Sequence, residues 1–160
     1  MIKRSEISPI ALDFSKMTEP QELLFMNGEI VKARDTIISI YNKAKHKIII
    51  IDNYVNYNTL RLLLEVKAGL EIFIYTNNAN NYLKDDDMNE FKKERPDVRI
   101  SFIKIEKIIH DRFIILDDNK MYNLGASSKD FGKKVSMIHE VRDEMMKDAL
   151  LNAIKLCQAP

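Results

Sequence analysis

The stretch that decides the fold is His110-Asp111-Arg112-Phe113-Ile114-Ile115-Leu116-Asp117, in the last third of the chain. Its apolar half is typical of a buried β-strand, and its polar half places a histidine and an arginine two positions apart. Because alternate residues of a strand lie on the same face, we expect His110 and Arg112 on one face where the strand begins. A second apolar run, at residues 121–124, follows the turn formers of residues 118–120, and this spacing predicts an antiparallel hairpin.

Strands and helices alternate on both sides of this hairpin. The β-branched run at 47–53 predicts a central strand that is covered on both faces. The remaining apolar patterns predict helices at 31–45, 57–67 and 85–94, strands at 70–76 and 98–104, helical turns at 127–133, a strand at 135–141 and a helix at 142–156. In the last helix we expect four residues to face inward: Met145, Ala149, Leu150 and Ala153. The pattern as a whole predicts an α/β fold, with a mixed parallel and antiparallel β-sheet flanked by helices on both faces.

Length and composition indicate one domain in a soluble chain. The 160 residues predict a single domain over 1–160, with a lead-in segment at 1–22 and a core at 23–156. With 46 % hydrophobic and 31 % charged residues and a single cysteine, the chain is neither disordered nor disulfide-stapled. No apolar run approaches a membrane span, so we expect a cytoplasmic protein. The net charge of +1 means that any polyanionic partner would have to be bound by local basic clusters.

The stretch beginning at His110 resembles the HxKxxxxD signature of the phospholipase D superfamily, with Asp117 at its end. Two further elements follow in the family's order: the small-residue turn that begins at Gly125, and the acidic residue Glu140 on the last expected strand. The order of the elements from residue 23 to residue 156 resembles one half of the two-lobed phospholipases, or one subunit of the small bacterial endonucleases of that superfamily. The resemblance therefore covers nearly the whole chain.

The resemblance implies roles for individual residues. His110 would be the nucleophile that forms a phosphohistidine, Arg112 would bind the phosphate oxygens, and Glu140 would hold a histidine in the correct tautomer. Asp117 and Gly125 would be structural. Ser127 would add a hydrogen-bond donor to the phosphate; alternatively, Ser127 is only the N-cap of a short helix, in a capping-box arrangement with Asp130.

Two departures from the family pattern affect the phosphate-binding residues. Arg112 stands where the family has lysine, and Lys129 stands near the place of the family's asparagine. Both residues keep a phosphate-binding donor, but they differ from the family's residues in geometry. We expect these two substitutions to affect catalytic activity more than they affect the fold.

A chain with one motif supplies one catalytic histidine, whereas the family's reaction uses two. The resemblance therefore implies a homodimer with the active site on its two-fold axis. It implies no cofactor and no metal. We expect a metal-independent phosphodiesterase whose substrate is nucleic acid, with a phospholipid substrate as the weaker alternative. A rival hypothesis is a catalytically weak module for nucleic-acid binding or dimerisation.

The other polar clusters have simpler interpretations. His46 and His139 are not accompanied in the sequence by a pattern of other metal-binding residues, so we interpret them as surface or structural residues. The acidic run at 85–87 is typical of a negative first helical turn. The basic cluster of Lys129, Lys133 and Lys134 directly follows the expected site, so it is expected to track a nucleic-acid backbone.

Overall fold

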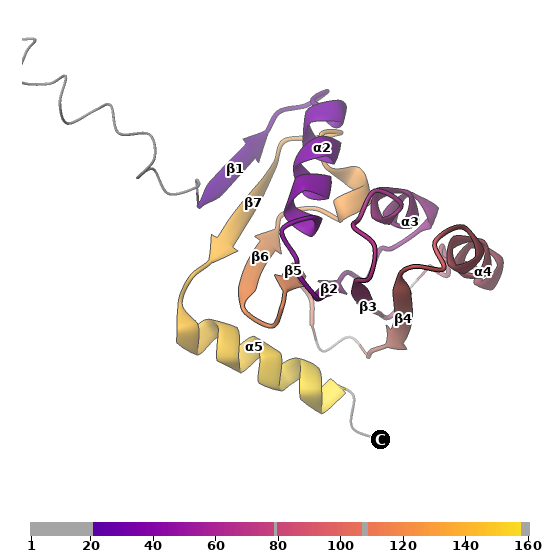
Figure 1. Ribbon diagram of the computed structural model, residues 1–160. Helices are drawn as coiled ribbons and strands as arrows, with labels where there is room; N and C mark the ends of the chain where they lie inside the picture. The colour runs from indigo at the N-terminus through magenta and orange to yellow at the C-terminus, as the bar shows by residue number, and fades with distance from the viewer. Residues whose placement is uncertain (1–20, 79, 107–108, 158–160) are drawn as a thin grey trace, which may run out of the picture.

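The computed structural model describes residues 21–78, 80–106 and 109–157, and in them seven strands form one sheet (Figure 1). In chain order the strands are β1 (Glu22–Phe25), β2 (Lys47–Ile51), β3 (Glu71–Thr76), β4 (Arg99–Lys104), β5 (Arg112–Leu116), β6 (Lys120–Leu124) and β7 (Ser136–Val141). Their order across the sheet is β1-β7-β6-β5-β2-β3-β4. β2, β3 and β4 are parallel, and all other neighbours pair antiparallel. The expected mixed sheet and the β5–β6 hairpin are confirmed.

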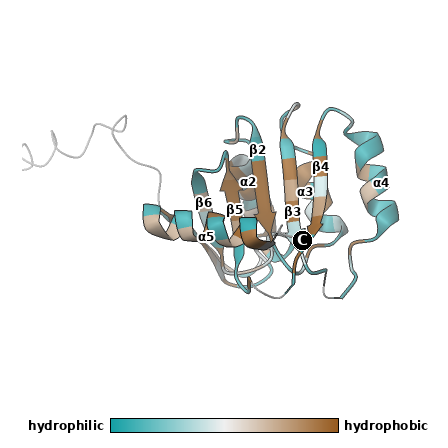
Figure 2. Ribbon diagram, turned by 90° about the horizontal axis from the view of Figure 1, so that it is seen from below, coloured by the Kyte–Doolittle hydropathy of each residue, from teal (hydrophilic) through white to brown (hydrophobic). Residues whose placement is uncertain are grey.

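Helices cover both faces of the sheet. On one face lie α2 (Ile30–Tyr41), α3 (Tyr57–Leu63) and α4 (Asp85–Glu94), and on the other lies α5 (Glu144–Cys157) (Figure 1). Strand β2 connects the two layers, because Ile48 and Ile50 pack with the first three helices and Ile49 and Ile51 pack on the α5 side. Each of these four isoleucines is at most 6 % exposed. Figure 2 shows the apolar residues concentrated in the central strands, with hydrophilic residues on the helices outside them.

Two helices are shorter than the apolar spacing predicts. α2 ends at Tyr41 and α3 ends at Leu63. The cause is Asn42, whose side chain donates to the carbonyl of Glu65 at 3.0 Å and accepts from the backbone N–H of Lys67 at 2.9 Å. Side-chain hydrogen bonds to the backbone compete with helix continuation, so both chain segments leave their helices here and are joined.

The orientation expected for the last helix is partly wrong. Met145 is 82 % exposed, and Ala149 is also exposed. The buried side of α5 is formed instead by its second half, where Leu150, Leu151 and Ile154 pack on the sheet. The first turn carries Met145 beyond the apolar surface of the sheet, so a hydrophobic residue there has nothing to cover it.

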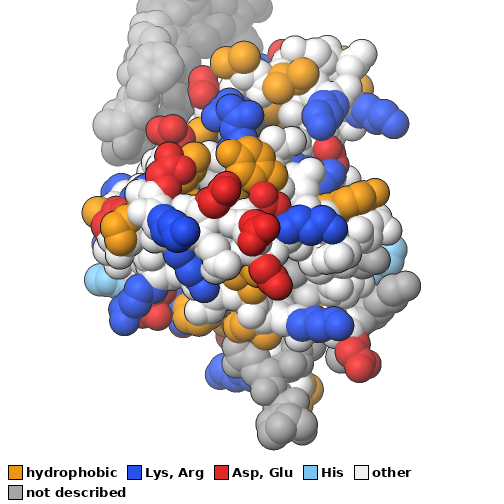
Figure 3. All heavy atoms as spheres, turned by 90° about the vertical axis from the view of Figure 1, so that its right-hand side faces the viewer, with side chains coloured by type: hydrophobic (Ala, Val, Ile, Leu, Met, Phe, Trp, Pro, Cys, Tyr) orange, Lys and Arg blue, Asp and Glu red, His pale blue; other side chains and the backbone are white. Residues whose placement is uncertain are grey.

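The face that carries α4 mixes charges of both signs (Figure 3). Asp85, Asp86 and Asp87 form the first turn of this helix, and Lys92 and Lys93 lie in its last turn. This arrangement complements the helix dipole, and it agrees with the interpretation of the acidic run as a helix start. The expected lead-in lies outside the described residues up to position 20, and β1 begins at Glu22 as an edge strand against β7.

Candidate active site

The site residues meet at one edge of the sheet because the central strands alternate in direction. β2 ends there, β5 begins there, and β6 ends there before the turn that leads to β7. The register pairs Ile51 with Phe113 and Arg112 with Leu124. Asp52, Arg112 and the turn after Leu124 are therefore brought together, although they are far apart in the sequence.

The centre of this arrangement is Asp52, a carboxylate that is only 2 % exposed. One of its oxygens accepts from the hydroxyl of Ser127 at 2.5 Å and from the backbone N–H of Ser128 at 3.3 Å. The other oxygen accepts from the backbone N–H of Tyr54 at 2.8 Å and lies 3.9 Å from Nε of Arg112. A buried carboxylate is retained only where donors and a counter-charge compensate for its desolvation. We call Asp52, Arg112, Ser127 and Ser128 the Asp52 cluster.

Arg112 is held between Asp52 and an aromatic ring. Its guanidinium lies over the ring of Tyr54, with 5.2 Å from the guanidinium carbon to the ring centroid. Its Nε is buried and makes no hydrogen bond within the described residues, since 3.9 Å is too long for one. The side chain as a whole is 26 % exposed. Arg112 is thus a positioned cation with remaining capacity to bind an anion.

The Asp52 cluster rests on a buried tyrosine. Burial raises the pKa of the Tyr41 hydroxyl well above its ordinary range, and the negative charge of Asp52 acts in the same direction. Tyr41 therefore remains neutral at every physiological pH. The Asp52 cluster therefore lies against a buried, uncharged hydroxyl group.

His110 lies at the mouth of β5, and its side chain is fully exposed. Its Nδ1 is 3.6 Å from a carboxylate oxygen of its neighbour Asp111, which is beyond hydrogen-bond distance for a positioned ring. In the single chain the imidazole is thus accessible from all sides and has no fixed orientation.

Glu140 does not meet His110 of the same chain. The register places Glu140 beside Tyr122 on β6, and Tyr122 beside Ile114 on β5, four positions beyond His110. Its carboxylate accepts from the guanidinium of Arg142 at 3.1 Å. The structure therefore brings His110, Arg112 and Ser127 to one edge and leaves Glu140 deeper in the sheet.

The turn after β6 places Ser127 and Lys129 differently from the sequence expectation. The alternative interpretation of Ser127 as a side-chain N-cap is wrong, because the short helical turn η2 (Ser128–Asp130) has no side-chain cap. The Ser127 hydroxyl, 2.5 Å from Asp52, is already committed as a donor. Lys129 forms an ion pair with Asp130 at 2.5 Å. Gly125 is packed tightly, since a Cβ there would lie 3.2 Å from the carbonyl oxygen of Met137.

Asp117 ties the far end of β5 to the start of β2. Its carboxylate accepts the backbone N–H groups of Lys45, His46 and Lys47 at 2.9, 2.8 and 3.0 Å. Partial burial acts to raise the pKa of Asp117, but these three hydrogen bonds outweigh it and lower the pKa below 3.8. Asp117 is remote from the Asp52 cluster, at the opposite end of the strand.

Sequence reasoning missed Asp52. The residue was visible only as a turn former at the end of the 47–53 run, and nothing local indicates that β2 pairs antiparallel with β5. A polar residue that ends a strand buried on both faces is the one available signal. That signal becomes specific only once the register opposite Arg112 is known.

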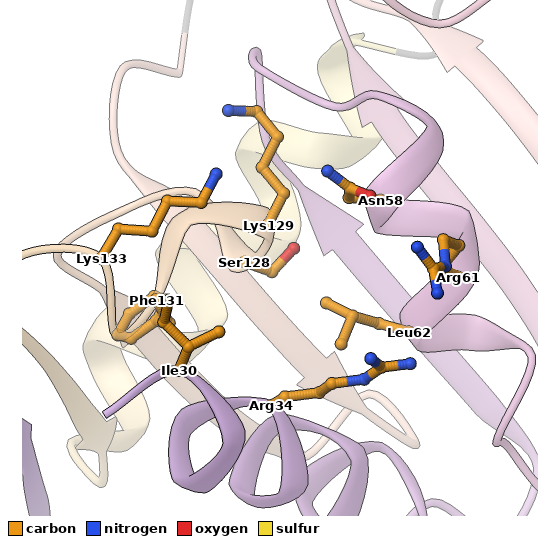
Figure 4. A pocket seen from close by; sticks show the side chains of 9 residues that line it. All are labelled: Ile30, Arg34, Asn58, Arg61, Leu62, Ser128, Lys129, Phe131 and Lys133. Atoms are coloured by element: carbon orange, nitrogen blue, oxygen red, sulfur yellow. The ribbon is translucent and has the colours of Figure 1, made fainter. Parts of the chain in front are cut away.

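A recess lies beside the Asp52 cluster, between α2, α3 and η2 (Figure 4). Its volume is about 180 Å³. The lining residues are Ile30, Arg34, Asn58, Arg61, Leu62, Ser128, Lys129, Phe131 and Lys133. We call it the basic pocket, because each charged residue that lines it is positive.

The described part of the chain lacks a metal-binding cluster and a membrane-spanning helix. No group of three or more histidine, cysteine or acidic residues there could hold a metal ion. None of the described helices combines the length and the apolar character that crossing a bilayer requires.

Comparison with known proteins shows similarity at the level of structure. No family model matches the sequence, and no curated protein matches it. Nuc from Salmonella typhimurium, a phospholipase D family member, superposes with a TM-score of 0.60 at 15 % identity over 87 % of this chain and 94 % of Nuc. NucT from Helicobacter pylori gives a TM-score of 0.60 at 14 % identity over 85 % and 94 %. The chain thus has the fold of phospholipase D family members, as the sequence resemblance implies.

A third similar structure is a larger protein. TrmBL2, an archaeal chromatin protein with a novel mode of DNA binding, superposes with a TM-score of 0.50 at 12 % identity. The match covers 94 % of this chain but 56 % of TrmBL2. The fold therefore occurs both as a nearly whole chain and as a part of a longer one.

Proposed function

We propose that the protein is a phosphodiesterase that hydrolyses DNA or RNA without a metal ion, through a covalent phosphohistidine at His110, in a homodimer. One observation carries the proposal: a buried carboxylate positions Arg112 two residues from an accessible histidine, at the edge where the sheet strands end. Arginine beside histidine supplies both a phosphate clamp and a nucleophile. The fold shared with phospholipase D family members supports it.

In the proposed first step, a ring nitrogen of His110 attacks phosphorus in line with the leaving oxygen. The N–P bond forms as the P–O bond breaks, and the electron pair goes to the leaving oxygen. The partner subunit's His110 gives that oxygen a proton. Arg112 binds the non-bridging oxygens, whose negative charge grows in the transition state. Asp52 and Ser127 are positioning residues, because they hold Arg112 and the turn but do not reach the phosphate.

In the proposed second step, water cleaves the phosphohistidine. The partner subunit's His110 takes a proton from the water, whose oxygen attacks phosphorus and displaces the nitrogen of His110. Both histidines return to their starting protonation states. Since Glu140 does not meet His110 of its own chain, its role as a histidine holder is proposed for contact across the dimer.

The homodimer is proposed because a single chain lacks half of the machinery. His110 is exposed and unoriented in one chain, and imidazole is the side chain that both attacks and protonates near neutral pH. A two-fold axis near His110 would bring two copies of it together without further residues. Light scattering at micromolar concentration is expected to give twice the mass of the chain.

The test is cleavage of labelled DNA and RNA oligonucleotides in excess EDTA. The parent protein is expected to cleave, and His110→Ala is expected to lose at least about a thousandfold in rate. His46→Ala is the matched control, since His46 is an exposed histidine whose hydrogen bonds are made by its backbone: the N–H donates to Asp117, and the carbonyl accepts from the N–H of Glu71. Equal cleavage by the parent and His110→Ala would overturn the proposal.

A second candidate function is nucleic-acid binding without turnover. Two observations favour it: the free orientation of His110, and the similarity to a chromatin protein that binds DNA. On this hypothesis the parent binds oligonucleotides but cleaves none, and His110→Ala binds as the parent does. The cleavage test therefore separates the two functions.

A further inference from the structure

The basic pocket joins three elements that are distant in the sequence. α2 contributes Arg34, α3 contributes Arg61, and the segment around η2 contributes Lys129 and Lys133. Figure 4 shows these side chains around one recess, with Arg34 and Arg61 on the side of the helices and the lysines on the opposite rim. The two lysines follow the expected site in the sequence, whereas no sequence pattern places the two arginines beside them.

The four cations differ in their pairing. Lys129 and Lys133 both contact the carboxylate of Asp130, at 2.5 and 3.2 Å. The side chains of Arg34 and Arg61 form no ion pair or hydrogen bond with any described residue. Two exposed guanidinium groups beside two ammonium groups repel one another, so an anion between them would be stabilised. The contrast with the α4 face, where acidic and basic side chains lie together (Figure 3), shows that this clustering is local.

The rest of the lining combines two polar residues, Asn58 and Ser128, with apolar ones. Ile30, Leu62 and Phe131 contribute hydrophobic surface to the same recess. Guanidinium groups bind phosphate oxygens through paired N–H donors, and apolar surface accepts a sugar or an unstacked base. The combination fits a nucleotide unit of a single strand better than it fits a simple inorganic anion.

The basic pocket and the Asp52 cluster share one residue, Ser128. Ser128 lines the pocket, and its backbone N–H donates to Asp52 at 3.3 Å. A strand whose scissile phosphate lies at Arg112 would therefore enter the pocket with a neighbouring nucleotide. The same turn connects the two places, so they are held at a fixed separation.

The walls of the pocket are fixed by a glycine contact. Gly132 accepts the backbone N–H of Gly28 at 2.8 Å, and a Cβ at Gly132 would lie 2.6 Å from the carbonyl oxygen of Glu29. This close approach fastens the segment of Phe131 and Lys133 to the start of α2. The recess is formed before any ligand arrives, which reduces the entropy that binding loses.

We propose that the basic pocket is a second phosphate-binding subsite, in which Arg34 and Arg61 bind the phosphate of an unpaired nucleotide next to the one at Arg112. The inference rests on the proposed nucleic-acid substrate. It concerns binding alone, so it can fail or hold independently of cleavage.

The experiment measures binding of a fluorescein-labelled single-stranded DNA oligonucleotide in EDTA, over a range of salt, with His110→Ala as the background that prevents cleavage. Adding Arg34→Gln and Arg61→Gln is expected to weaken binding about tenfold or more. The slope of log K against log salt is expected to become shallower by about 1.4, since each phosphate contact on a single strand contributes about 0.7. A control with Lys92→Gln and Lys93→Gln removes the same charge from α4 and is expected to keep the slope.

Two further arms make the result decisive. Arg34→Lys with Arg61→Lys keeps the charge and is expected to keep the slope, which excludes misfolding as the cause of the loss. Parent-like binding and slope in the glutamine pair would overturn the inference, as would binding to anionic lipid vesicles but not to the oligonucleotide. Arginine-dependent binding by a parent that cleaves nothing would support the subsite and refute the proposed hydrolysis. With the same arginine substitutions in the parent, which keeps His110, unchanged cleavage together with unchanged binding would refute the subsite and support the proposed hydrolysis.

Discussion

The Asp52 cluster and His110 lie at the same edge of the sheet, yet they differ in almost every physical property. Asp52 is 2 % exposed and accepts three hydrogen bonds. The His110 side chain is fully exposed and has only a 3.6 Å approach to Asp111. One chain thus holds Arg112, the proposed phosphate-binding residue, in place, and it leaves His110, the proposed nucleophile, without a fixed orientation.

The difference teaches which parts of the site the single chain determines. Orientation of Arg112 is a property of the fold, because it follows from the pairing of β2 with β5 and from the turn after β6. On the proposed function, orientation of His110 comes from a bound substrate or from a second subunit. Substitutions in the buried half are expected to have the largest effects on stability.

The largest effect is expected at Asp52. Asp52→Asn removes the counter-charge of Arg112 and presents an amide to groups that are themselves donors, so the free energy of unfolding should fall by about 3 kcal/mol. Urea denaturation measures this. The control is Asp118→Asn, because Asp118 is 51 % exposed and pairs only with Lys47; its cost should stay below about 1 kcal/mol. Equal costs at the two sites would mean that the cluster is not a buried unit.

A smaller effect is expected at Gly132, which fixes the pocket beside the cluster. Gly132 has a φ of +83°, and a Cβ there would be 2.6 Å from the carbonyl oxygen of Glu29. Gly132→Ala should cost about 2 kcal/mol or more, from backbone strain and the clash together. Gly69 has the same φ of +83° with no atom within 4 Å of the added Cβ, so Gly69→Ala should cost only the strain, about 1 kcal/mol. Thermal unfolding of the two variants should separate the two contributions.

Asp117 provides a pH-dependent effect at the far end of β5. Its pKa is lowered in the folded state by the backbone N–H groups of residues 45–47, against the opposing effect of burial. The resulting stability is present above the ordinary value of 3.8 and is lost as the pH falls through the lower folded value. Asp117→Asn should therefore cost about 1 to 2 kcal/mol at neutral pH. The gap between parent and variant should close in acid, and a gap that widened there would contradict the assigned hydrogen bonds.

The fold and part of the site were predictable from the sequence for physical reasons. The isoleucine run of β2 and the hairpin after His110 are local patterns, and local patterns determine elements. Asp52, Arg34 and Arg61 escaped prediction because their meaning depends on which distant elements become neighbours. Met145 was misplaced because helical periodicity identifies an apolar stripe, but it does not say how far the sheet extends beneath it.

The most direct test of the account combines stability and cleavage in one variant. His110→Ala should unfold within about 0.5 kcal/mol of the parent, because the side chain is fully exposed. The same variant should lose cleavage of labelled oligonucleotides in excess EDTA while it still binds them. A variant that cleaves as the parent does, or a parent that cleaves no oligonucleotide, would contradict the central claim that His110 is the nucleophile of a phosphodiesterase.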